Sequence, residues 1–205
     1  MKRLIGFVLI AVFCAGVVSA QEKASPVAVS VQGKSAINPA SVYQQVYKKD
    51  VITVVSPNQA GWSLLESNSV KTIFEKRAQE EILNASVRIF TIEIFETDEE
   101  LLMSVETDKK EELEDEYKRD SIHFNYIRFK ATPCLQYDGI FNFKEATPKF
   151  KYFNLRGYVC AHPKNKNLVI QMEFSNRSNL RGFSNDLFSL SDEFFEKTVF
   201  PKKNE

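Results

Sequence analysis

Residues 168–174 read LVIQMEF, and the alternation within this stretch decides the fold class. Every second side chain is apolar, at Leu168, Ile170, Met172 and Phe174. A repeat of two is that of a β-strand, because successive side chains of a strand point to opposite faces of the sheet. The stretch therefore predicts a strand with one face in a core.

A second stretch, residues 87–95, is largely apolar on both of its faces. Val87 and Ile89 point one way, whereas Phe90, Ile92 and Ile94 point the other. A strand that is buried on both sides needs a layer above it and a layer below it. This pattern predicts a central strand with helices or another sheet on each face.

Shorter strand patterns surround these two stretches. Their ranges are 51–55, 62–65, 70–75, 122–130, 135–137, 140–143 and 150–159. Asp138-Gly139 separates two apolar runs and predicts a two-residue hairpin turn, because both central residues of such a turn take positive φ.

Two helices are expected. Thr97 and Glu100 form a capping-box pattern at the start of the first, which runs to about Arg119. The charged run Asp108-Lys109-Lys110 interrupts its apolar stripe and predicts a break or an exposed middle turn. The second helix covers about residues 185–199, and Pro201 ends it.

The order of these elements predicts an α+β fold. We expect an antiparallel-rich sheet with two main helices packed on it, in a single domain over residues 42–205. The preceding residues 21–41 are small and polar and are interpreted as a flexible tether.

The first 20 residues resemble a secretory signal peptide. Lys2 and Arg3 precede an apolar run, and small residues lead to a predicted cleavage between Ala20 and Gln21. The run is too short for a membrane-spanning helix, and the mature chain contains no other candidate. The expected location is periplasmic or secreted.

Attachment of a lipid at Cys14 is the alternative to simple cleavage. Phe13 disfavours it, because lipoprotein processing needs a small residue before the cysteine, and Phe13 is bulky. We therefore expect a mature chain that starts at Gln21 without lipid.

The mature chain is close to neutral. Loss of Lys2 and Arg3 would leave 25 basic against 27 acidic residues, a net charge of −2. Nucleic-acid binding depends on neutralising phosphates with an excess of basic residues. The sequence therefore argues against a nucleic-acid partner.

Cys134 and Cys160 are the two cysteines that remain after cleavage. In an oxidising compartment an even pair predicts a disulfide. A zinc site with His123 and His162 is the rival interpretation, but its spacing is not one that zinc sites favour. In the loop-entropy description, closing this loop removes about 3.5 kcal/mol of unfolded-chain entropy.

Short motifs mark the mature sequence: Ser56-Pro57 before Gly61-Trp62, the two cysteines beside the later strands, and Ser175-Asn176-Arg177 after a strand. In this layout the chain resembles small exported bacterial proteins of unassigned function. Its strand and helix order is also similar to the PsbP-like sandwich. Members of that family are mostly accessory or assembly factors, so the resemblance implies a noncatalytic accessory role.

The common catalytic motifs are missing from the sequence. The five mature glycines are not clustered as Walker or dinucleotide-binding loops require, and Gly-x-Ser-x-Gly does not occur. His162, ahead of Pro163, is interpreted as a solvated or locally hydrogen-bonded turn residue. We expect no cofactor and no metal, and a noncatalytic role is favoured over an enzyme.

Basic side chains outnumber acidic ones by eight to three between Thr132 and Gly182. The candidate partner-binding residues among them are Lys149, Lys151, Arg156, Arg177 and Arg181. Local positive charge suits an anionic protein, glycan or lipid surface. The hypothesis is an exported noncatalytic accessory or binding protein. The alternative is a periplasmic hydrolase or glycan-acting enzyme whose carboxylates are brought together only by the fold.

Overall fold

The computed structural model of this chain describes residues 46–48, 52–144 and 149–201. The predicted signal peptide (1–20), its cleavage site, Cys14 and the tether (21–41) lie outside the described residues, so they remain predictions.

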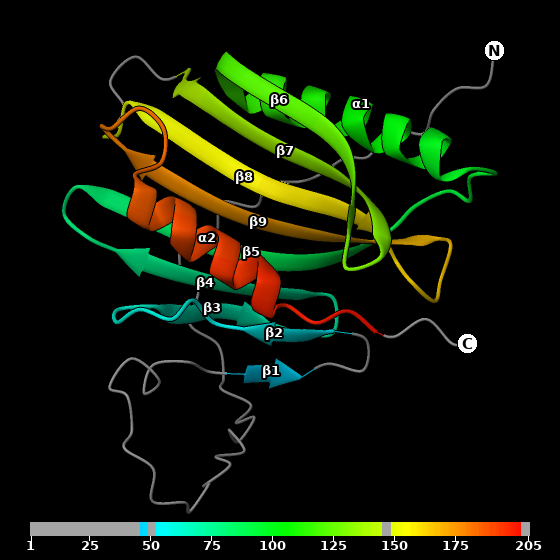
Figure 1. The fold of residues 1–205 in the computed structure, drawn as a ribbon. Coiled ribbons are helices and arrows are strands. Elements are labelled where there is room, and N and C mark those ends of the chain that lie inside the picture. The colour runs from blue at the N-terminus through cyan, green and yellow to red at the C-terminus, as the bar shows by residue number, and fades with distance from the viewer. Residues whose placement is uncertain (1–45, 49–51, 145–148, 202–205) are drawn as a thin grey trace, which may run out of the picture. The chain divides into compact units, whose positions relative to one another are not determined.

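A seven-stranded sheet forms the framework of the described part (Figure 1). Its strands are β3 (Ser63–Ser67), β4 (Lys71–Arg77), β5 (Glu81–Thr91), β6 (Tyr117–Phe129), β7 (Thr132–Phe143), β8 (Tyr152–Ala161) and β9 (Leu168–Ser178). They lie in the order β3-β4-β5-β9-β8-β7-β6, and all neighbours are antiparallel. A separate ribbon of β1 (Val46–Lys48) and β2 (Thr53–Val55) is linked to the end of the chain by a bridge between Thr53 and Val199.

The stretch that decided the fold class forms β9, which lies between β5 and β8. Its residues Ile170, Met172 and Phe174 belong to one apolar core, as the alternation predicted. Val169 belongs to a second core on the opposite face. The prediction that β9 has one face in a core was therefore incomplete, because a helix covers part of its other face as well.

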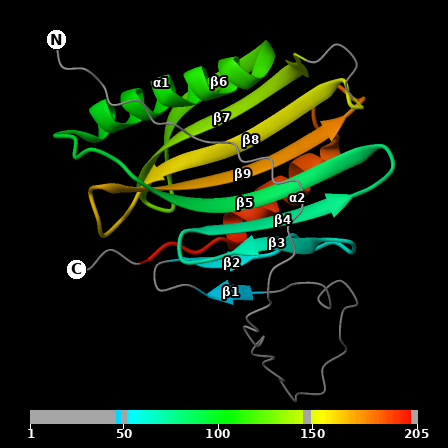
Figure 2. The ribbon, with the colours of Figure 1, turned by 180° about the vertical axis from the view of Figure 1, so that it is seen from behind.

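Two helices cover opposite faces of the sheet, as the two figures show from the front and from behind (Figures 1 and 2). The first, α1 (Asp98–Glu116), packs on β6, β7 and β8. The second, α2 (Asn185–Lys197), adds its buried Phe194 and Phe195 to the other core. This confirms the predicted α+β class with two main helices on an antiparallel sheet in one domain.

Side chains cap the start of both helices. Glu100 donates its backbone N–H to Thr97 Oγ1 over 3.1 Å, and Glu100 Oε2 accepts from the N–H of Thr97 over 3.3 Å. The capping box that the sequence predicted is thus confirmed. At α2 the hydroxyl of Ser184 accepts from the N–H of Leu187.

The hairpin turn predicted at Asp138-Gly139 was wrong. Strand β7 runs straight through both residues, and the tight turn lies at Lys130–Ala131, whose φ angles are +52° and +61°. Gly139 is needed for another reason, because a Cβ there would lie 2.5 Å from the ring of Phe141. The glycine makes room for a neighbouring ring instead of bending the chain.

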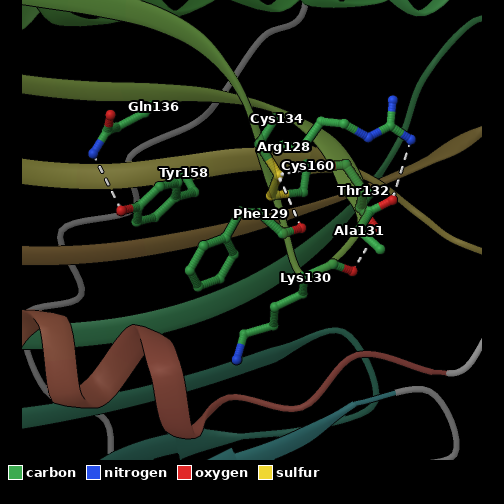
Figure 3. The surroundings of a disulfide bond; sticks show 9 residues. All are labelled: Arg128, Phe129, Lys130, Ala131, Thr132, Cys134, Gln136, Tyr158 and Cys160. Carbon is green, nitrogen blue, oxygen red and sulfur yellow. Dashed lines mark hydrogen bonds between the residues drawn. A yellow bond between two sulfur atoms is a disulfide. The ribbon is translucent and has the colours of Figure 1, made fainter.

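The disulfide between Cys134 and Cys160 joins directly opposite residues of β7 and β8 (Figure 3). Their Cα atoms are 4.1 Å apart, and neither residue is exposed. The predicted pairing is confirmed. The bond lies next to the Lys130–Ala131 turn, where Arg128 donates to the carbonyl of Ala131.

Candidate functional site

One end of the sheet gathers exposed basic side chains. It is the end where β6 and β8 begin and β7 and β9 finish, at the left of Figure 1. The pairings Lys118–Asn142, Asn142–Tyr152 and Tyr152–Ser178 place these four strand ends in one row. We call this region the basic end; its exposed cations are Lys118, Arg119, Lys144, Lys149, Lys151 and Arg181.

Three of these cations have local partners. Arg119 pairs with Glu114 at 3.1 Å, and Arg181 pairs with Asp120 at 2.8 Å. Lys144 donates to the backbone carbonyls of Glu114 and Asp115 in the last turn of α1, where a positive charge complements the helix dipole. Their charges are therefore partly offset within the fold.

The other three, Lys118, Lys149 and Lys151, form no ion pair with a described residue. The ammonium groups of Lys149 and Lys151 lie 4.8 and 5.0 Å from the ring centres of Phe150 and Tyr152. The backbone between them is fixed, since the N–H of Lys151 donates to Asn179 Oδ1. This end therefore presents positive charge that the described part of the chain does not neutralise.

Arg156 does not belong to this surface, although the sequence placed it among the candidates. The residue is only 7% exposed, and its side chain lies under α2, with the guanidinium 3.4 Å from the ring centre of Phe188. It donates to the carbonyl of Phe188 and to the hydroxyl of Ser191, and it pairs with Asp192 at 3.0 Å. Arg156 thus fastens α2 to β8.

Arg177 lies near the basic end but is partly buried. Phe153 is its partner on β8, and the guanidinium lies 5.9 Å from the Phe153 ring centre. Its Nε is buried and has no hydrogen-bond partner in the described part of the chain. The structure therefore brings together Lys149, Lys151 and Arg181, places Arg177 beside them, and separates Arg156.

Sequence analysis missed Lys118 and Lys144. Both lie at strand ends that only the pairing of β6 with β7 brings next to β8. Lys144 was one of the eight basic residues counted between Thr132 and Gly182 but was not singled out, and Lys118 lay in the range assigned to the first helix. No local signal in the sequence marks either residue.

A second polar cluster is buried between α1 and the centre of the sheet. Lys109 Nζ donates to Glu112 Oε2 over 2.8 Å and to Glu173 Oε1 over 2.7 Å. Tyr137 also donates to Glu173 Oε1 over 2.7 Å, and Gln171 donates to the Tyr137 hydroxyl over 3.3 Å. The helix break expected around Lys109 was wrong, because α1 is continuous and Lys109 is one of its buried residues.

The members of this cluster fix one another's protonation. Burial would lower the pKa of Lys109, but the charges of Glu173 and Glu112 hold it above its ordinary value. Burial would raise the pKa of Glu173, but Lys109 and Arg88 hold it below its ordinary value. Burial and the neighbouring Glu173 raise the pKa of Tyr137 well above its usual value. At neutral pH the cluster is an ammonium, a carboxylate and a phenol.

Gly157 makes the cluster possible. Tyr137, Gly157 and Glu173 are consecutive partners on β7, β8 and β9. A Cβ on Gly157 would lie 2.6 Å from the Tyr137 hydroxyl oxygen and 2.5 Å from the carbonyl oxygen of Met172. The missing side chain lets the tyrosine cross β8 and reach the carboxylate.

Two carboxylates do converge here, as the enzyme alternative required. Glu112 and Glu173 both contact the nitrogen of Lys109, so the ammonium occupies the space between them.

A hollow on the opposite face, lined in part by Asp138, Arg156 and Tyr158, has a volume of about 10 Å³. That is about the space of one water molecule.

His162 lies in the turn between β8 and β9, as expected, and is buried. Its Nδ1 accepts from the N–H groups of Lys164 and Asn165 over 3.2 and 3.1 Å. Burial, with a smaller contribution from the charge of Lys164, lowers the pKa of His162. The residue stabilises a turn in its neutral form.

The described ranges contain no group of three or more His, Cys, Asp or Glu residues placed to hold a metal ion. The same ranges contain no helix that is both long and apolar enough to cross a membrane.

No protein-family model matches the chain, and no curated protein matches it in sequence. Among solved structures it is similar to the solution structure of cyanobacterial PsbP (CyanoP) from Synechocystis sp. PCC 6803. The identity is 14%, the TM-score is 0.48, and the match covers 84% of this chain and 99% of that chain. The match is to the PsbP-like layout expected from the sequence. A likeness at this level concerns the fold and says nothing about partners or chemistry.

Proposed function

We propose that this chain is an exported accessory or binding protein that acts without catalysis and holds an anionic partner at its basic end. One observation carries the proposal: Lys118, Lys149 and Lys151 have no acidic partner among the described residues, whereas the buried cations Lys109 and Arg156 are paired. Unneutralised cations that face the solvent attract negative charge.

The state of the buried cluster supports a role without catalysis. Lys109, Glu173 and Tyr137 satisfy one another's hydrogen bonds and charges, so none of them is a free acid or base at neutral pH. The ammonium between Glu112 and Glu173 leaves no room for a substrate oxygen between these carboxylates. The disulfide supports export, because such bonds persist in oxidising compartments.

Charge reversal at the two ends of β8 tests the site. The double variant Lys149→Glu/Lys151→Glu alters the basic end, and Lys164→Glu/Lys166→Glu makes the same change of charge in the turn at the other end of β8. We expect the first variant to capture its partner at least about tenfold less well, since each lysine near an anionic surface contributes about 1 kcal/mol. The second variant should bind like the unchanged protein.

The measurement is crosslinking of the exported protein in its own cells, followed by identification of what is attached. The identity of the attached molecule separates an acidic protein from a glycan or a lipid. Equal capture by the two double variants would contradict the assignment of the basic end.

A further inference from the structure

The loop that joins β9 to α2 carries an exposed leucine at the basic end. Leu180 is 72% exposed and lies two residues after the end of β9. Its neighbour Asn179 accepts from the N–H of Lys151 over 3.0 Å, so this loop lies directly beside the start of β8. A single exposed apolar side chain is common on protein surfaces, so what matters is how this one is held and what surrounds it.

Hydrogen bonds fix the backbone on both sides of Leu180. Its N–H donates to Ser178 Oγ over 3.2 Å, and its carbonyl accepts from the same hydroxyl over 3.1 Å. The side-chain amide of Asn154, which is fully buried, donates to this carbonyl over 3.1 Å and accepts from the N–H of Gly182 over 2.8 Å. A buried asparagine thus holds the loop in a conformation that leaves the Leu180 side chain in the solvent.

Unpaired cations share this end of the sheet with Leu180. Lys118, Lys149 and Lys151 are exposed and form no ion pair with a described residue. Arg181 follows Leu180 directly, but an aspartate already offsets its charge, so it is not counted among them. The three lysines lie at the starts of β6 and β8, which β7 separates in the sheet. Positive charge is therefore spread along a row of strand ends and is not gathered around one point.

This combination suits an anionic lipid surface better than a glycan or a protein. Lipid headgroups move laterally and can meet lysines on different strand ends, and each lysine near such a surface contributes to binding. The hydrocarbon below the headgroups can take up an exposed leucine. A glycan has no hydrocarbon layer, and a specific protein interface buries a much larger apolar core than one loop leucine provides.

We propose that the basic end docks on the surface of an anionic bilayer, with its three unpaired lysines at the headgroups and Leu180 inserted among them. This proposal rests on the function proposed above, because it names the partner that the basic end holds. The docking is reversible, since one leucine and three lysines give far less affinity than a membrane-spanning helix.

Cosedimentation of the exported protein with lipid vesicles tests the docking. Vesicles that contain phosphatidylglycerol are negatively charged, whereas vesicles of phosphatidylcholine alone are not. We expect at least about tenfold tighter binding to the anionic vesicles at low salt, and a smaller preference at high salt, where charges are screened. Lys149→Glu/Lys151→Glu should reduce binding to the anionic vesicles at least about tenfold, whereas Lys164→Glu/Lys166→Glu should bind like the unchanged protein.

A second pair of variants tests the insertion of the leucine. Leu180→Ser should weaken binding to the anionic vesicles about tenfold, because it removes the apolar contact and leaves every charge in place. The matched control is Ile94→Ser, which should bind like the unchanged protein. Ile94 is also 72% exposed, but it follows β5, whose last residue pairs with the first residue of β9 at the opposite end of the sheet. Circular dichroism checks whether each variant keeps its fold.

The outcomes distinguish this proposal from the function proposed above. If the protein does not bind anionic vesicles, but Lys149→Glu/Lys151→Glu still loses its crosslinked partner, the basic end holds an acidic protein or a glycan and the lipid proposal is wrong. If neither vesicle binding nor crosslinking depends on these lysines, both proposals are wrong. Equal vesicle binding by Leu180→Ser and Ile94→Ser would overturn the insertion.

Discussion

Helix α2 covers its face of the sheet with phenyl rings, whereas α1 covers the opposite face around a lysine held between two glutamates. Phe194 and Phe195 are almost fully buried, and the ring centre of Phe195 lies 5.0 Å from that of Tyr158. On the other side Lys109, also buried, contacts Glu112 and Glu173. Apolar burial is non-directional, while a buried ion pair fixes which groups must meet. Both faces contain a buried apolar cluster, so the difference concerns how the helix is positioned: the ion pair of Lys109 with Glu173 fixes which groups of α1 and β9 must meet.

The largest effect is expected on the aromatic face. Phe195→Ala should lower the free energy of unfolding by about 4 kcal/mol, because it removes a buried ring and leaves a cavity. Urea unfolding at neutral pH measures the change. Phe195→Leu is the control and should cost about 1.5 kcal/mol or less, since it keeps most of the volume. A loss below about 1 kcal/mol for the alanine variant would mean that this core collapses easily.

The next effect is expected at Lys109. Lys109→Met should cost about 3 kcal/mol, because it leaves the carboxylate of Glu173 without its nearest cation. The double variant Lys109→Met/Glu173→Gln removes both charges and should recover to within about 1 kcal/mol of the unchanged protein. The same unfolding experiment compares them. If the double variant is no more stable than the single one, the cost arises from packing and not from the unpaired charge.

The smallest effect is expected on how the free energy of unfolding depends on pH. The contribution of Glu173 to this dependence should change sign in Lys109→Met. The pKa of Glu173 lies below its ordinary value, so its contribution is present above the unfolded pKa and is lost as the pH falls through the folded pKa. In Lys109→Met, burial without the cation should raise that pKa, so that acidification from pH 7 to pH 4 relieves the penalty.

Unfolding curves at several pH values between 7 and 4 measure this difference. The difference in free energy of unfolding between Lys109→Met and the unchanged protein should shrink by about 1 kcal/mol on acidification. Phe195→Ala is the control, and its gap should stay constant. Parallel pH profiles for all three proteins would show that Glu173 is not controlled by Lys109.

Much of the fold could be predicted because its signals are local. The alternation in residues 168–174 marks a strand wherever it lies, and Thr97 with Glu100 marks a helix start from four residues alone. The prediction of a turn at Asp138-Gly139 was wrong because it also relied on a local signal. Such a signal does not show that the ring of Phe141 needs the space at Gly139. The real turn at Lys130–Ala131 has no glycine to reveal it.

The buried cluster around Lys109 and the position of Arg156 could not be predicted, because they depend on contacts between distant parts of the chain. Lys109 lies four residues after Val105 and four before Leu113, so this spacing places it on the apolar stripe of α1. We did not predict its burial, because a lysine is charged and is rarely buried. Its partner Glu173 is 64 residues away, and no spacing indicates it. The burial of Arg156 likewise follows from where α2 packs, which the sequence does not state.

Gly157 also constrains how neighbouring strands can move past one another. The Tyr137 side chain crosses β8 at Gly157 and ends on Glu173 of β9, so it joins two strands that share no backbone hydrogen bond. A slip of β7 or β9 by two residues would keep each side chain on its own face but would separate the phenol from the carboxylate. The tyrosine thus favours one alignment of the neighbouring strands β7, β8 and β9 over the alternatives.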